Sequence, residues 1–138
     1  MKILSIDLGK TCGIAVKGDT GEGFVFTEEF KHNGYESFSK KVDELITTYK
    51  PELILIPYPT RFYKVILAHA KLMGIVEMFA DMNDITVIEV QDATCKKVVL
   101  GSGRAKKPEI MERYNEASEH VADAKMFIEW YIKKAIDI

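Results

Sequence analysis

Residues 53–59, Leu53-Ile54-Leu55-Ile56-Pro57-Tyr58-Pro59, decide how the rest of the chain can be arranged. The four consecutive apolar side chains predict a strand that is buried on both faces, as is typical of the centre of a parallel sheet. Pro57 and Pro59 end this strand abruptly, because a proline ring has no N–H to donate to a strand ladder. We therefore expect a central strand at 53–56, in a sheet that is covered on both faces.

The residues before this strand predict three more strands and a helix. Residues 2–7 form a short apolar run, and glycine-containing turns separate it from the runs Ile14-Ala15-Val16 and Phe24-Val25-Phe26. These runs predict an antiparallel meander of three strands. Residues 35–49 carry apolar side chains at helical spacing, and Pro51 then forces a break, so this segment predicts an amphipathic helix.

The residues after the central strand alternate between helix and strand patterns. Residues 61–82 predict a helix and residues 85–90 a buried strand, and a strand-helix-strand unit implies a parallel pair. A short helix and a glycine-rich basic loop are predicted within 92–107. Pro108 suits the first turn of another helix, and Ser118 is the predicted N-cap of the last one.

This order predicts an α/β fold in a single domain, residues 1–138. Its mixed five-stranded sheet would have three antiparallel strands followed by two parallel strands, with helices on both faces.

Composition narrows the class of protein. The two cysteines, Cys12 and Cys95, lie far apart and form no CxxC pair, so we expect neither a disulfide framework nor a zinc site. No apolar stretch reaches the roughly 20 residues that span a bilayer. We therefore expect a soluble protein without membrane association, in a reducing, cytoplasmic setting.

A net charge of −2 argues against a nucleic-acid-binding protein, but the charge is unevenly distributed. Between residues 96 and 107 every charged side chain is basic: Lys96, Lys97, Arg104, Lys106 and Lys107. Such a cluster either contacts the phosphates of a nucleic acid or is an ordinary solvated turn.

Three residues could carry chemistry. Asp7 follows the first apolar run, where a carboxylate projects from the edge of the sheet, and Gly9 and Gly13 allow close approach beside it. His120 and Asp123 are three residues apart on the last helix, so they point the same way and could reach a common metal ion. Alternatively, Asp7 only begins a turn, and the other two residues only help to cap a helix.

Three segments resemble, in the same order, the landmarks of RuvC-type Holliday-junction resolvases, which belong to the RNase H-like nucleases. They are Ser5-Ile6-Asp7-Leu8-Gly9, the loop Gly101-Ser102-Gly103-Arg104-Ala105-Lys106-Lys107, and His120-Val121-Ala122-Asp123-Ala124. The resemblance runs along the whole chain. It implies an RNase H-like fold and a metal-dependent, structure-specific endodeoxyribonuclease that cleaves phosphodiesters at Holliday or other branched DNA junctions.

The resemblance also implies residue roles. Asp7, His120 and Asp123 would be both the catalytic residues and the ligands of Mg²⁺ or Mn²⁺, with Asp7 bridging, Asp123 terminal and His120 a nitrogen ligand or proton carrier. Lys96 and Lys107 match lysines that contact DNA in the family. A four-way junction is two-fold symmetric, so the enzyme would act as a homodimer.

Aromatic and basic residues after the central strand extend the expected DNA surface. Tyr58 and Phe62 could stack on unpaired bases, and Arg61 would add positive charge. At helical spacing such aromatic side chains can equally belong to the core.

One position departs from the family. The resemblance places the family's second catalytic acid on Pro57, and proline cannot bind a metal ion. The alternative function is therefore a catalytically impaired RNase H-like protein that binds branched nucleic acid or a partner without cleaving.

Overall fold

The computed structural model describes residues 1–19, 21–59 and 63–136. Its strands are β1 (Ile3–Asp7), β2 (Thr11–Lys17), β3 (Phe24–Lys31), β4 (Leu53–Pro57) and β5 (Thr86–Val90), and its helices are α1 (Tyr35–Tyr49), α2 (Tyr63–Met82), α3 (Asp92–Leu100), α4 (Lys107–Tyr114) and α5 (Glu119–Ile136). The elements follow one another in the predicted order. None of the described helices is long and apolar enough to cross a membrane.

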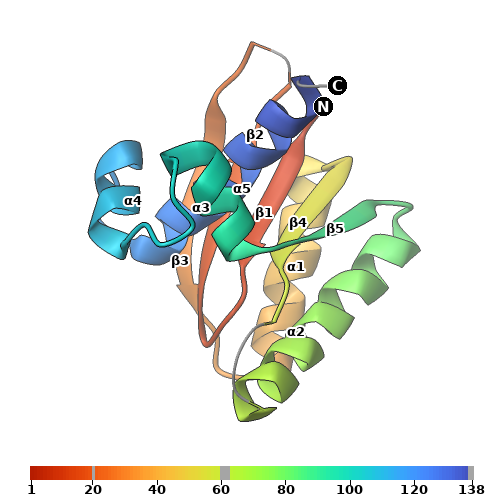
Figure 1. Ribbon diagram of the computed structural model, residues 1–138. Helices are drawn as coiled ribbons and strands as arrows, with labels where there is room; N and C mark the ends of the chain where they lie inside the picture. The colour runs from red at the N-terminus through yellow and green to blue at the C-terminus, as the bar shows by residue number, and fades with distance from the viewer. Residues whose placement is uncertain (20, 60–62, 137–138) are drawn as a thin grey trace.

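The strands form one mixed sheet in the order β3-β2-β1-β4-β5 (Figure 1). β1 pairs with β2 and β2 with β3 in antiparallel fashion, whereas β1 pairs with β4 and β4 with β5 in parallel fashion. The prediction of three antiparallel and two parallel strands is therefore confirmed. β4 is buried along its whole length, as its continuous apolar run predicts.

Helices cover both faces of the sheet (Figure 1). Leu4 and Ile6 of β1 belong to the core cluster that includes residues of α1 and α2, whereas Ile3 belongs to the cluster that includes residues of α3, α4 and α5. Because side chains alternate along a strand, Asp7 points to the same face as Ile3 and Ser5. The period of the strand thus directs Asp7 toward α5.

The same alternation places Pro57 beside Asp7. Leu53 and Leu55 of β4 belong to the α5-side cluster, so Pro57 lies on that face too. The register pairs Ser5 with Leu55, and Asp7 and Pro57 each follow these residues by two positions. Both residues therefore end neighbouring parallel strands at one edge of the sheet.

Candidate active site

The first turn of α5 rests directly on β2. A Cβ atom added to Gly13 would overlap the backbone of His120 and Val121, so only glycine allows this approach. Gly13 pairs with Asp7 across the β1–β2 ladder. The close approach expected at Gly13 is thus made by the protein's own helix, and it brings His120 next to Asp7.

Ser118 holds the start of α5 in place. Its Oγ accepts a hydrogen bond from the Val121 N–H at 3.2 Å, which is the N-cap interaction expected from the sequence. The same hydroxyl donates to Glu29 Oε1 of β3 at 3.0 Å. The end of the helix that carries His120 is therefore tied to the sheet.

Asp7 and His120 form a close pair. Asp7 Oδ2 lies 3.5 Å from His120 Nδ1, and the two side chains are only 17% and 31% exposed. Burial raises the pKa of Asp7, although the contact with His120 opposes this effect. The Asp7 carboxylate in turn raises the pKa of His120. A partly buried carboxylate and an imidazole thus compete for one proton.

Asp123 lies one helical turn beyond His120, in a surplus of negative charge. Burial, followed by the charges of Asp7 and Asp92, raises the pKa of Asp123 to about 8. Lys96 and Lys107 oppose this rise, but they do not cancel it. A cation added to this place would relieve the repulsion between the carboxylates.

Two of the predicted basic residues border these acids. Lys96 Nζ lies 2.6 Å from the carboxylate of Asp92, and Lys107 Nζ lies 2.9 Å from that of Glu119. Lys97, Arg104 and Lys106 are exposed on α3, the following loop and the residue before α4. The basic segment thus has two lysines that pair with acids near Asp123, of which Lys107 is still 63% exposed, and three further basic residues that face solvent.

The aromatic and basic residues after β4 are only partly described. Tyr58 is 50% exposed, and its N–H donates to the Val90 carbonyl at 2.7 Å. Its ring is therefore available at the edge of the sheet and is not part of the core. Arg61 and Phe62 lie outside the described residues.

Sequence reasoning missed two residues at this edge. Asp92 opens α3 two residues after the end of β5, so an acid following a predicted strand was the signal that could have found it, as it found Asp7. β5 itself is an edge strand in which only Val90 is fully buried, so the prediction of a buried strand at 85–90 is wrong. His69 of α2 had no such signal. Its Nε2 lies 2.7 Å from the Pro57 carbonyl oxygen, because α2 folds back across the end of β4.

The donor atoms suit a divalent cation by their chemistry. Asp7 and Asp123 offer carboxylate oxygens, His120 offers an imidazole, and the charge on the two acids is incompletely neutralised. Within the described ranges, no group of three or more His, Cys, Asp or Glu side chains is arranged to hold a metal ion as it stands.

The sequence matches no protein-family model and no curated protein. Its fold, however, is similar to that of several solved structures. RuvC from Thermus thermophilus is 19% identical, with a TM-score of 0.78 over 98% of this chain and 97% of RuvC. The same protein in complex with a Holliday junction gives 20% identity and a TM-score of 0.79, over 98% of this chain and 94% of RuvC. The fowlpox virus Holliday junction resolvase is 14% identical, with a TM-score of 0.65 over 98% of this chain and 99% of the resolvase. The chain therefore has the RNase H-like fold that RuvC and other Holliday junction resolvases share.

Proposed function

We propose that this protein is a metal-dependent endonuclease that cleaves phosphodiesters in branched DNA, including four-way junctions. The observation that carries the proposal is the gathering of Asp7, His120 and Asp123 at one sheet edge, with more negative charge than the surroundings neutralise. If Asp7 and His120 only held the start of α5 in place, the helix would not need a second partly buried acid, Asp123, on its next turn. The similarity to junction resolvases in fold supports the same reading.

Asp7 and Asp123 would hold Mg²⁺ or Mn²⁺, with His120 as a third ligand. When bound, such an ion would supply Lewis-acid activation of water and of the phosphodiester. An imidazole among the ligands favours Mn²⁺ over Mg²⁺.

The protein's own residues would prepare the site. The β1 strand fixes Asp7, and Gly13 allows the α5 backbone to bring His120 against it. His120 can hold a proton while in contact with Asp7, or release it when a cation takes its place. Lys96, which Asp92 anchors beside Asp123, would meet a phosphate oxygen.

A homodimer would present two such sites to a symmetric junction. Helix α2 supports this part of the proposal, because Leu67, Met78 and Met82 are exposed along it. Met73, by contrast, is buried and belongs to the core. The exposed apolar side chains are the candidate contact between two copies.

Pro57 favours a second candidate function, binding without cleavage. Its ring stands on the site face beside Asp7, where it offers no carboxylate to a second ion. In this case the basic residues would still bind a junction, while the acids would hold at most one ion and leave the phosphodiester intact.

Nicking of a synthetic four-way junction separates the two functions. The wild-type protein should nick a labelled junction in Mg²⁺ or Mn²⁺, and Asp7→Asn should bind the same DNA but lose nicking by about 10² or more, as expected when a metal ligand is removed. A gel-shift assay on the same samples reports binding. Binding without metal-dependent nicking would select the non-cleaving function.

A further inference from the structure

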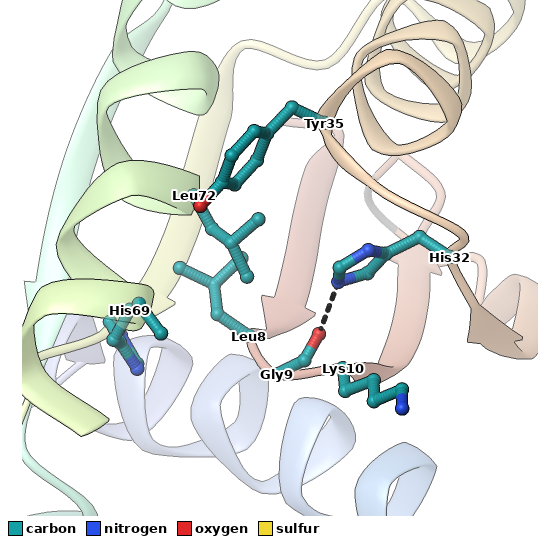
Figure 2. A pocket seen from close by; sticks show the side chains of 8 residues that line it. Leu8, Gly9, Lys10, His32, Tyr35, His69 and Leu72 are labelled. Atoms are coloured by element: carbon teal, nitrogen blue, oxygen red, sulfur yellow. Dashed lines mark hydrogen bonds between the residues drawn. The ribbon is translucent and has the colours of Figure 1, made fainter. Parts of the chain in front are cut away.

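A cavity lies on the other side of the β1–β2 turn from His120 and Asp123. Its volume is about 380 Å³, and its walls come from that turn, from His32 after β3, from Tyr35 at the start of α1, and from α2 (Figure 2). Leu8, which follows Asp7 directly, forms part of the wall and packs in the α1–α2 core cluster. The cavity and the candidate active site are therefore back to back across one turn.

The walls have the character of a site for a flat, partly polar ring. Leu8 and Leu72 provide apolar surface, and Figure 2 shows the rings of His32, Tyr35 and His69 around the same space. The volume falls in the range of roughly 300–1,000 Å³ that small-molecule sites occupy. Planar side chains with apolar support are the features that bind nucleobases by stacking.

Two of these rings are held in place by backbone carbonyl groups. His32 Nε2 lies 2.9 Å from the Gly9 oxygen, and His69 Nε2 lies 2.7 Å from the Pro57 oxygen. A carbonyl can only accept, so each Nε2 carries a proton, and in the neutral ring Nδ1 is left as an acceptor. Among the described residues, His32 Nδ1 is buried and has no hydrogen-bond partner. An atom that is covered in this way cannot meet a ligand in the cavity, so His32 contributes the surface of a ring in a fixed orientation and no free acceptor.

Charge and position connect the cavity to the candidate active site. His69 reaches the edge of the sheet where Asp7 lies, because its Nε2 is 2.7 Å from the carbonyl oxygen of Pro57, the last residue of the neighbouring strand β4. Lys10 extends from the turn beside the cavity, is exposed, and can meet the phosphate of a nucleotide (Figure 2). A nucleotide lying at the ends of β1 and β4 could thus turn its base over the β1–β2 turn.

We propose that this cavity receives an unpaired nucleobase of branched DNA, from a nucleotide adjoining the phosphodiester that lies at Asp7. The proposal rests on the proposed function and adds to it a subsite for one base. It gives the protein a reason to prefer junctions, because bases next to a branch point cost less to unstack than bases within a duplex.

Abasic scanning with a variant that fills the cavity tests the proposal. Four-way junctions that each lack one base near the branch point are titrated against the protein in EDTA, so that binding is measured without cleavage. Loss of the base that occupies the cavity should weaken binding to the wild-type protein by about tenfold, the scale of a base–aromatic stack. All other abasic positions should matter less.

Ala68→Trp fills the cavity from an exposed position on α2, and Ala70→Trp places the same side chain on a neighbouring exposed position that does not line the cavity. Ala68→Trp should bind the intact junction about tenfold more weakly and should no longer respond to the abasic substitution. Ala70→Trp should behave as the wild type does. Tyr35→Ala, which removes an exposed ring, is a second variant that should reduce the abasic effect without filling the cavity.

Equal responses of Ala68→Trp and wild type to every abasic junction would overturn the cavity assignment. That outcome is distinct from failure of the nuclease proposal, which is read from nicking in Mg²⁺ or Mn²⁺. A protein with the abasic pattern but no nicking keeps the base subsite and loses the enzymatic function. A protein that nicks but shows no abasic pattern keeps the function and loses the subsite.

Discussion

Asp123 and Glu129 belong to the same helix, α5, but their surroundings act on them in opposite ways. Burial raises the pKa of Glu129, but hydrogen bonds from Arg113 and Tyr114 outweigh it and leave the pKa lowered. Burial also raises the pKa of Asp123, and there the negative charges of Asp7 and Asp92 add to it, giving about 8. The second half of the helix is built for stability, whereas its first turns tolerate an unfavourable charge. Such tolerated charge is typical of functional sites.

The contacts at the two places explain the contrast. Arg113 holds Glu129 through two nitrogens, at 2.8 and 3.1 Å, and the Tyr114 hydroxyl donates to it at 2.8 Å. Lys125 pairs in the same way with Glu116. Near Asp123 the lysines are bound to other acids, Lys96 to Asp92 and Lys107 to Glu119. The positive charge near the site is thus already engaged.

Gly13→Ala should have the largest effect on stability, because the first turn of α5 can pack against β2 only while position 13 has no side chain. The added methyl group overlaps the His120 backbone, which cannot rotate away as a side chain can. We expect the free energy of unfolding to fall by about 3 kcal/mol or more, which is the upper end of the usual cost of overpacking. Urea denaturation measures the loss, and NMR of the His120 ring reports its separation from Asp7.

Gly23→Ala is the matched control, because a Cβ there meets nothing within 4 Å. Equal stability of the two variants would show that α5 does not depend on glycine at position 13.

Asp123→Asn should stabilise the protein while removing a proposed ligand. The pKa of Asp123 is raised in the folded state from 3.8 to about 8, so the folded protein binds the proton more tightly, and wild-type stability falls as pH rises between these values. The variant lacks this fall. We expect it to be more stable than wild type at pH 8 by about 0.5–2 kcal/mol, the common gain from relieving an unfavourable site. Urea denaturation across pH 4 to 8 checks this.

Glu129→Gln tests the other part of α5 in the same denaturation experiment, and its effect on stability should have the opposite sign. The pKa of Glu129 is lowered in the folded state, so the ionised Glu129 stabilises the folded protein at pH values above its pKa in the unfolded chain. This stabilisation is lost as pH falls through its pKa in the folded protein. The pair is partly exposed, so we expect the variant to lose only about 1 kcal/mol at neutral pH. If both variants changed stability in the same direction at pH 8, the contrast between the two parts of α5 would be wrong.

Much of the sheet could be predicted because its strands have distinct patterns. The continuous apolar run of β4 and the helical spacing of 35–49 led directly to the observed elements. β3 is longer than the predicted run at 24–26, because Thr27, Glu28 and Glu29 interrupt the apolar sequence. The burial of the strand nevertheless alternates, with Glu28 at a partly buried position between Phe26 and Phe30, where Lys41 pairs with it at 2.8 Å.

Residues of the candidate site could be predicted where their position along a single strand or helix was enough to place them at the edge of the sheet. Asp7 at the end of a strand and His120 on a helix turn needed only the strand and helix periods. His69 depends on how α2 crosses the end of β4, which no local pattern encodes. Gly13 was singled out for close approach, but the approaching group, the α5 backbone, could be identified only from the packing.

Asp92→Asn should have the smallest effect on stability. It tests why the pKa of Asp123 is raised while that of Glu129, on the same helix, is lowered. Removing the charge of Asp92 takes away one of the two acids that raise the pKa of Asp123, so this pKa should fall from about 8 in the metal-free protein. The lost pair with Lys96 offsets the relief, so stability should change by no more than about 0.5 kcal/mol. Carboxyl ¹³C NMR across pH measures the titration, and Asp43→Asn on the exposed face of α1 makes the same charge change elsewhere. An Asp123 titration that is identical in both variants would mean that burial and Asp7 account for the whole shift. In that case the surplus charge at the start of α5 would be confined to one strand and one helix, and α3 would have no part in the site beyond holding Lys96.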